Sequence, residues 1–176
     1  IGYRRVVDLA RRSGMNTDIR ATPAMALGAY EVTPLEVAAA YTIFANRGTF
    51  VEPTLTREVR NAESAEPVID NAIRRRAVLD PRVAYLMTNM MQDVMRVGTG
   101  AGVRGRGFWQ PAAGKTGSSR DGWFVGFTSK LICAVWVGFD DGQDIVLEGA
   151  RTALPIWADF MKRAHTHRAY KNVAEF

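Results

Sequence analysis

The segment Gly114-Lys115-Thr116-Gly117-Ser118-Ser119 combines a cation, hydroxyls and glycines within six residues. In an extended strand the side chains of Thr116 and Ser118 point to one face, and that of Lys115 to the other. The Thr116 hydroxyl could donate to a carboxylate lying antiparallel to the strand, with Lys115 supplying a positive field. The Ser118 backbone N–H could stabilise an oxyanion, and Gly117 lets a substrate approach closely because it has no Cβ. The segment therefore predicts a carboxylate-binding strand with one oxyanion donor.

Two other interpretations of this segment compete with that one. A phosphate-binding loop also ends in Gly-Lys-Thr, but it needs a glycine five positions before Gly114, where this chain has Trp109. It also needs a following helix, whereas residues 121–125 are typical of a turn and a strand. A polar edge strand with a solvated lysine is the second alternative, and the bare triplet would favour it. The apolar strands that follow and the glycine-rich loop that precedes favour the carboxylate-binding strand instead.

The last third of the chain predicts the sheet to which this segment belongs. Connections of three residues each are short enough to join successive strands as hairpins. The third strand is apolar on both faces, so we expect it inside a sheet that is covered on both sides. A closing helix is expected at about residues 153–165. The three strands are expected at residues 114–119, 123–127 and 131–138.

The first hundred residues predict mainly helices. A short amphipathic helix is expected over residues 3–10, ending at Gly14. Thr33-Pro34-Leu35-Glu36 forms a capping box with proline at the first helical position, and Gly48 is expected to end that helix in a left-handed conformation. Asp80-Pro81 opens a further helix. Its apolar stripe, expected to pack in the core, consists of Val83, Leu86, Met87, Met90, Met91 and Val94.

Shorter elements and the overall class follow from the remaining segments. Residues 54–59 and 67–69 are expected to be strands on either side of a turn at residues 61–64. The five glycines of residues 97–107 predict a loop. The chain is thus expected to be α+β, an antiparallel meander packed with helices. We expect a helical region at about 1–100, the sheet meander at about 112–140 and the final helix last.

Composition limits the classes of partner. The 176 residues are 47% apolar and 23% charged, which excludes disorder over most of the length, and no apolar run is long enough to span a membrane. The net charge of +5 permits an acidic partner, but Arg74-Arg75-Arg76 has no interleaved aromatic residue, so no nucleic acid is predicted. Cys133 is expected to be a buried, inert thiol. His165 and His167 are expected to be exposed, and neither a metal nor a cofactor is predicted.

Residues 112–119 followed by residues 121–127 resemble the carboxy-terminal catalytic motif of class A penicillin-binding proteins. The resemblance extends over nearly the whole chain in the family's order. Further family-like segments are residues 26–28, 31–38, 44–46, 98–100, 134–141 and 154–157.

The resemblance implies a partial β-lactamase/transpeptidase-like fold and a D,D-transpeptidase activity. Such an enzyme cross-links peptidoglycan stem peptides through a seryl intermediate and is acylated by β-lactams. In this family Lys115 and Ser118 would be catalytic, and Thr116, Gly117 and Ser118 would bind substrate. The family also implies a membrane-anchored protein at the periplasmic face of the cell membrane, with a glycosyltransferase domain in another part of the protein.

The nucleophile is not found in this sequence. The family pairs its strand motif with Ser-x-x-Lys and Ser-x-Asn, and neither occurs among the 176 residues. Both precede Ile1 in the family order, so we expect a missing amino-terminal part to complete the domain and this chain to be inactive alone. Ser118 and Ser119 have no activating base placed by sequence. The alternatives are a D,D-carboxypeptidase or β-lactamase-like hydrolase, and a non-catalytic peptidoglycan-binding module.

Overall fold

A three-stranded antiparallel sheet between helices forms the body of the protein. The computed structural model describes residues 2–15 and 18–176; Ile1, at the expected start of the helical region, lies outside them. Strands follow one another in the order β5-β6-β7, so the predicted meander is confirmed. These strands comprise Ala113–Ser118 (β5), Gly122–Phe127 (β6) and Ile132–Val137 (β7).

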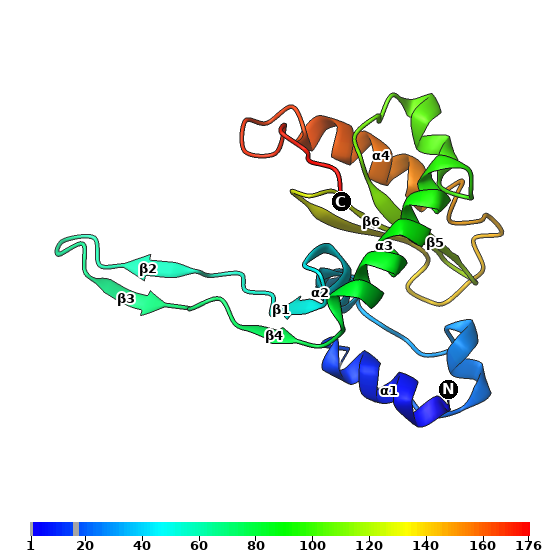
Figure 1. Ribbon diagram of the computed structural model, residues 1–176, viewed down its shortest axis with the longest axis horizontal. Coiled ribbons are helices and arrows are strands. Elements are labelled where there is room, and N and C mark those ends of the chain that lie inside the picture. Colours follow the sequence, from blue (N-terminus) through cyan, green and yellow to red (C-terminus); the bar gives the residue numbers. More distant parts are fainter. Residues whose placement is uncertain (1, 16–17) are drawn as a thin grey trace.

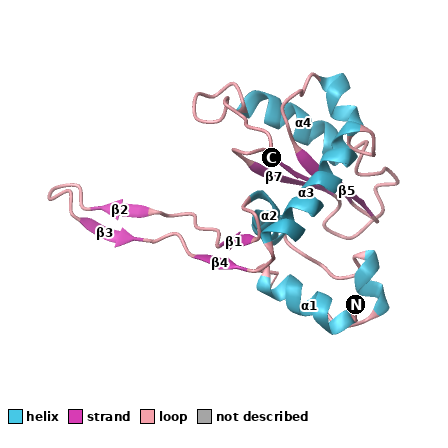
Figure 2. Ribbon diagram, viewed as in Figure 1, coloured by secondary structure: helices cyan, strands magenta, loops and turns pink. Residues whose placement is uncertain are grey.

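Helices cover both faces of this sheet (Figures 1 and 2). The closing helix α4 (Ala153–Ala164) was predicted and packs on β6 and β7. On this face Phe124 of β6 is fully buried, its ring centroid 5.0 Å from that of Trp157. On the other face α2 (Pro34–Ala45) and α3 (Pro81–Arg96) meet Phe127, which is also fully buried. The two faces of β6 thus anchor two separate apolar clusters.

The prediction that the third strand lies inside the sheet is wrong. In the described chain β7 is an edge strand, and β6 lies at the centre between β5 and β7. The expected cover on both faces is confirmed, because α2 and α4 both contact β7. Apolar residues on both faces of a strand show that other elements cover both faces. They do not show whether the strand is hydrogen-bonded to a neighbouring strand on one side or on both.

The start of α2 is confirmed and its end differs from the prediction. Thr33 Oγ1 accepts a hydrogen bond from the Glu36 N–H at 3.2 Å, and Glu36 Oε2 accepts one from the Thr33 N–H at 2.9 Å. At the other end Gly48 has the predicted positive φ, at 92°, but the left-handed residue directly after the cap is Arg47, with φ of 50°, and this was not predicted. Gly48 donates to Ile43 O, and a Cβ on Gly48 would overlap the Leu79 carbonyl oxygen. Gly48 is therefore needed for a close approach beside a Schellman-type end at Arg47.

Helix α3 begins as predicted but buries a different face. Asp80 caps it by accepting a hydrogen bond from the Arg82 N–H at 2.8 Å. The buried residues are Ala84, Thr88, Met91 and Met95, whereas Val83, Leu86, Met87 and Met90 are exposed. The predicted core stripe is thus wrong except at Met91, which is buried, and Val94, which is half-buried. Helical spacing identifies an apolar stripe, but the neighbouring helix and sheet decide which stripe is covered, and a small residue such as Ala84 suits a close contact.

An arm of two antiparallel ladders extends from the body (Figure 1, cyan to green). Its tip is β2 paired with β3, and the predicted second strand and turn are confirmed there. The expected strand over residues 54–59 is wrong except at its last two residues. The ladder at the base of the arm was not predicted. The strands are Thr49–Val51 (β1), Glu58–Arg60 (β2), Pro67–Asp70 (β3) and Arg75–Ala77 (β4).

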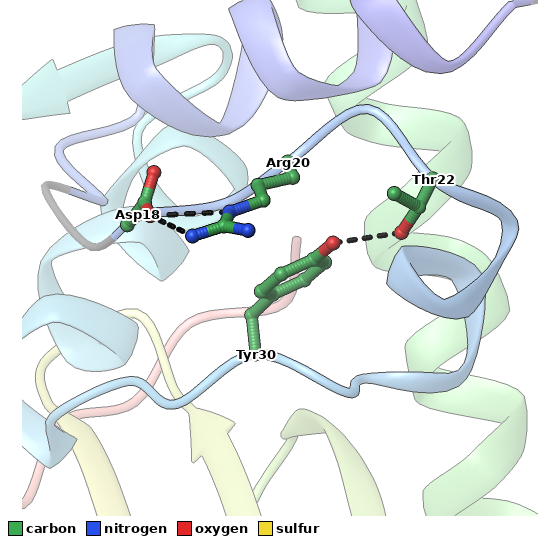
Figure 3. A network of polar contacts seen from close by, with 4 residues as sticks. All are labelled: Asp18, Arg20, Thr22 and Tyr30. Atoms are coloured by element: carbon green, nitrogen blue, oxygen red, sulfur yellow. Dashed lines mark hydrogen bonds and ion pairs between the residues drawn. The ribbon is translucent and has the colours of Figure 1, made fainter.

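The amino-terminal part packs beneath the base of the arm. Helix α1 (Tyr3–Arg12) ends just before Gly14, close to the predicted bounds. After it, Figure 3 shows a polar network in which the Thr22 hydroxyl lies 2.7 Å from that of Tyr30. This hydrogen bond closes the loop around the short 3-10 helix η1 (Pro23–Leu27). Beside it, Arg20 and Asp18 form an exposed ion pair at 3.1 Å.

Several smaller expectations change. The loop at residues 97–107 contains the 3-10 helix η2 (Ala101–Arg106). His165 is buried rather than exposed, with Nε2 3.0 Å from Thr128 Oγ1 and Nδ1 2.7 Å from Met161 O, while His167 is exposed as predicted. None of the described helices combines the length and apolarity needed to cross a bilayer.

Candidate functional site

Strand β5 carries the predicted site residues and lies at the edge of the sheet. It pairs with β6 along one side only, with Lys115 opposite Val125 and Thr116 opposite Phe124. In an antiparallel strand alternate backbone N–H and C=O groups point to opposite sides. The side of β5 away from β6 has no strand partner among the described residues, so an extended peptide could add there by β-strand pairing.

The Lys115 ammonium lies beside Thr116. Lys115 Nζ donates to Thr116 O at 2.7 Å and to Thr116 Oγ1 at 3.5 Å. The two side chains leave the strand on opposite faces, yet the long lysine bends around the edge and places its charge next to the hydroxyl. None of the ion pairs among the described residues includes Lys115, which is exposed. Its positive charge is therefore available to a ligand at this edge.

Thr99 belongs to the same cluster and was not predicted to. Its hydroxyl lies 2.7 Å from Thr116 Oγ1, although the two residues are seventeen positions apart. The sequence contains one indication of a role for Thr99, because Gly98-Thr99-Gly100 resembles the family, but this resemblance predicts no particular contact. The structure thus brings one ammonium and two hydroxyls together at the open edge of β5.

Ser118 and Gly117 are fixed by the loop that follows β7. Ser118 Oγ accepts a hydrogen bond from the Gly149 N–H at 2.9 Å. A Cβ on Gly117 would lie 3.1 Å from the Cβ of Trp123, and one on Gly149 would overlap the Gly117 carbonyl oxygen. A side chain at position 117 would thus be crowded by Trp123 of the neighbouring strand, and the close approach of Gly117 O explains the glycine at position 149. The expected substrate contact of Gly117 and the oxyanion role of the Ser118 N–H stay predictions.

Asp121 fastens the turn between β5 and β6. Its Oδ2 accepts hydrogen bonds from Trp123 Nε1 at 3.0 Å and from Trp136 Nε1 at 2.6 Å. The two indoles lie on β6 and β7 with ring centroids 6.4 Å apart. One carboxylate in the turn that follows β5 therefore binds side chains of both β6 and β7.

Cofactor and metal chemistry finds little support in these side chains. Among the residues that the structure describes, no three His, Cys, Asp or Glu side chains are grouped so as to hold a metal ion. Cys133 of β7 is half-buried, and this burial raises the pKa of its thiol to about 11. The thiol is therefore protonated at neutral pH and a poor nucleophile.

The cluster at β5 can bind a carboxylate. Lys115 offers three N–H donors and each hydroxyl of Thr116 and Thr99 offers one. Hydrogen bonds to a charged group contribute about 1.5–3 kcal/mol each. The free edge of the strand can hold the peptide that bears this carboxylate. Of the three interpretations of this segment, the polar edge strand and the carboxylate-binding strand are thus compatible with each other. The phosphate-binding loop is excluded, because β5 continues as a strand after Lys115 where that loop would need a helix.

Comparisons with known proteins agree with this geometry. The family model described as the penicillin binding protein transpeptidase domain matches residues 6–162. Penicillin-binding protein 1A of Neisseria meningitidis strain Z2491 is 37% identical over 174 residues, which cover 93% of this chain and 21% of that protein. The corresponding protein of Aquifex aeolicus is 34% identical over 167 residues, covering 92% and 22%. The chain therefore spans about a fifth of the length of these curated relatives.

Solved structures share the fold. The penicillin-binding protein PonA1 of Mycobacterium tuberculosis superposes with a TM-score of 0.80 at 22% identity, covering 96% of this chain and 51% of that one. The D,D-transpeptidase domain of a peptidoglycan glycosyltransferase from Eggerthella lenta gives a TM-score of 0.64 at 22% identity, with coverage of 92% and 48%. The predicted α+β, transpeptidase-like fold is thereby confirmed.

Proposed function

The chain belongs to the penicillin-binding protein transpeptidase domain family, and on this premise we propose that it forms one wall of a serine D,D-transpeptidase site. The enzyme cross-links peptidoglycan stem peptides by acyl transfer and is acylated by β-lactams. One observation carries the proposal: Lys115 and Thr116 present an ammonium and a hydroxyl at the open edge of β5. That edge suits an extended peptide ending in a carboxylate.

Each site residue has a defined task in this reaction. The substrate peptide lies antiparallel along β5, and Thr116 Oγ1 donates to its carboxylate. The Lys115 ammonium supplies the positive charge behind that contact. The Ser118 backbone N–H donates to the oxyanion that forms at the attacked carbonyl, an interaction worth about 2.7–4 kcal/mol in the barrier.

The nucleophile and its base are assigned to Ser-x-x-Lys, and a further contact to Ser-x-Asn, in sequence outside residues 1–176. Ser118 is a poor alternative nucleophile because its hydroxyl oxygen already accepts the Gly149 N–H. Acyl transfer through a serine splits one difficult step into two, with the acyl group held as an ester between them. Neither step needs a metal or cofactor.

The cellular setting follows from the same proposal. Peptidoglycan stem peptides lie outside the cytoplasm, so the site faces the periplasmic side of the membrane, and the anchor lies in another part of the protein. Transfer is favoured over hydrolysis because the family model that matches this chain describes a transpeptidase domain. The D,D-carboxypeptidase and the non-catalytic binding module are the outcomes that would displace this proposal.

Labelling with a fluorescent penicillin tests it. The complete gene product should form a stoichiometric adduct that survives denaturing electrophoresis and maps to the serine of Ser-x-x-Lys. Residues 1–176 expressed alone should form none, since donors stabilise a transition state only where a nucleophile attacks. An adduct on Ser118 or Ser119 would move the nucleophile into this chain. A complete, folded gene product without any adduct would favour the non-catalytic module.

A further inference from the structure

The turn after α3 presents a single side chain to β5. The Gly98 N–H donates to Asp93 O at 3.1 Å and the Gly100 N–H to Val94 O at 3.0 Å, which folds the turn back onto the last turn of the helix. A Cβ on Gly98 would lie 2.9 Å from Val94 Cα, and one on Gly100 would lie 3.0 Å from a sulfur and a carbonyl oxygen. A side chain at position 98 would therefore overlap the helix and one at position 100 would be crowded, so that Thr99 between them carries the only side chain of the turn.

This backbone arrangement fixes the position of the Thr99 hydroxyl. Helix α3 packs along β5, which places the end of the helix beside the strand. The Thr99 side chain is exposed, and its oxygen lies 2.7 Å from Thr116 Oγ1. A rigid turn thus holds a hydroxyl against the hydroxyl that is assigned to the substrate carboxylate.

The direction of this hydrogen bond matters for binding. A hydroxyl has one proton and two lone pairs, whereas an ammonium can only donate. Lys115 Nζ, at 3.5 Å, occupies one lone pair of Thr116 Oγ1. If Thr99 donates to the second lone pair, the Thr116 proton is left to point to the open edge. If Thr116 donates to Thr99 instead, that proton is not available to a carboxylate.

We propose that Thr99 is a positioning residue that donates its proton to Thr116 Oγ1 when substrate binds, so that the Thr116 proton is directed to the substrate carboxylate. This inference rests on the proposed function. The relay from Thr99 through Thr116 to the carboxylate aligns donors in one direction, which strengthens each hydrogen bond. Thr99 therefore sets the selectivity for substrates with a free carboxylate without itself touching the reacting atoms.

The test measures acylation of the complete gene product by a penicillin and by the methyl ester of that penicillin. Thr99→Val removes the donor at nearly constant shape, and Thr99→Ser keeps it. We expect Thr99→Val to slow acylation by the free acid about tenfold, the usual effect of one net hydrogen bond. Acylation by the ester should be unchanged, and Thr99→Ser should behave like wild type. Thr56→Val, at an exposed threonine of the arm, is the matched control.

Several results would overturn the inference. The first is a folded Thr99→Val variant that reacts with the free acid at the wild-type rate. The second is a Thr99→Val variant whose acylation rate falls equally for the acid and the ester. The third is a Thr99→Ser variant whose acylation rate falls as much as that of Thr99→Val. Thermal unfolding of each variant shows that it is folded, and Thr99→Ala replaces the valine variant if that one is not. A wild-type protein that no penicillin acylates would refute the proposed function itself, which separates that failure from this one.

Discussion

The β5–β6 and β2–β3 hairpins share antiparallel pairing and differ in their surroundings. The β5–β6 hairpin lies between helices on both faces, and Phe124 and Phe127 of β6 are fully buried. Every residue of β2 and β3 is exposed, and Val68 is 65% exposed. Backbone pairing is thus sufficient to form a hairpin, but only the packed hairpin holds side chains from distant segments in fixed positions. The candidate site lies on the packed hairpin.

The arm is secured at its base and not at its tip. The Arg76 guanidinium lies 4.3 Å above the centre of the Phe50 ring, and Gly48 O accepts hydrogen bonds from the N–H groups of Val78 and Leu79. Towards the tip, the register between β2 and β3 shifts at Val59. The turn there is held by the Asn61 side chain, which accepts hydrogen bonds from two backbone N–H groups. Local contacts alone maintain this part.

Substitution of Phe124 should have the largest effect. Phe124→Ala removes a ring that packs on Trp157 and leaves a cavity between β6 and α4, so we expect a loss of about 3–5 kcal/mol in unfolding free energy. Denaturant unfolding of the complete gene product measures it. A loss below about 1 kcal/mol would mean that the helix cover does not stabilise the sheet and would remove the contrast between the two hairpins.

Substitution of Lys115 should strongly slow the reaction at nearly constant stability. In the complete gene product, Lys115→Ala should lower the rate constant of penicillin acylation about 100-fold, equal to the loss of one or two hydrogen bonds to a charged group. The fold should persist because the side chain is exposed. Stopped-flow acylation gives the rate, and Lys130→Ala, an exposed lysine in the next turn, is the control. Equal rates in the two variants would remove Lys115 from the site.

Alkylation of the Cys133 thiol on β7, in the packed sheet, should be about tenfold or more slower than alkylation of a thiol at the tip of the arm. The raised pKa of Cys133 leaves less thiolate at pH 8 than an unburied thiol has, so alkylation by iodoacetamide should be slow and should accelerate up to about pH 11. A cysteine introduced by Ser64→Cys at the exposed turn of the arm should react fast, with a plateau near pH 9. Mass spectrometry of each peptide measures both rates. Equal rates would show that β7 opens freely.

Substitution in the arm should have the smallest effect. Ile69→Ala truncates an aliphatic side chain, a change that lowers the unfolding free energy when the side chain is buried in a core. Ile69, however, is 44% exposed and packs in none of the apolar clusters of the described residues. We expect a change of less than about 0.5 kcal/mol in unfolding free energy. The same denaturant experiment as for Phe124→Ala measures it. A loss above about 1.5 kcal/mol would show that the tip is packed in solution.

Elements set by neighbouring residues could be predicted from the sequence. The capping box at Thr33 and Glu36, the Asp80 cap and the meander of β5, β6 and β7 each depend on contacts within a few positions or on a short connection. The fold class and the cluster of Lys115 and Thr116 were predicted for the same reason, with the family resemblance adding the reaction. The end of α2 was predicted less well, because Arg47 takes a conformation that is usual for glycine.

Contacts between distant segments were decided only by the tertiary structure. The sequence contains two stripes on α3, and packing against β5 and α2 covered the one with Ala84 and Thr88. Burial of His165 depends on Thr128, thirty-seven positions away, and the Thr99–Thr116 contact on how α3 lies along β5. Spacing along a chain fixes which residues share a face, while the surface that covers this face comes from elsewhere in the fold. The residue types of the site and the proximity of Lys115 to Thr116 were therefore contained in the sequence, whereas the approach of Thr99 to Thr116 was decided by the tertiary structure.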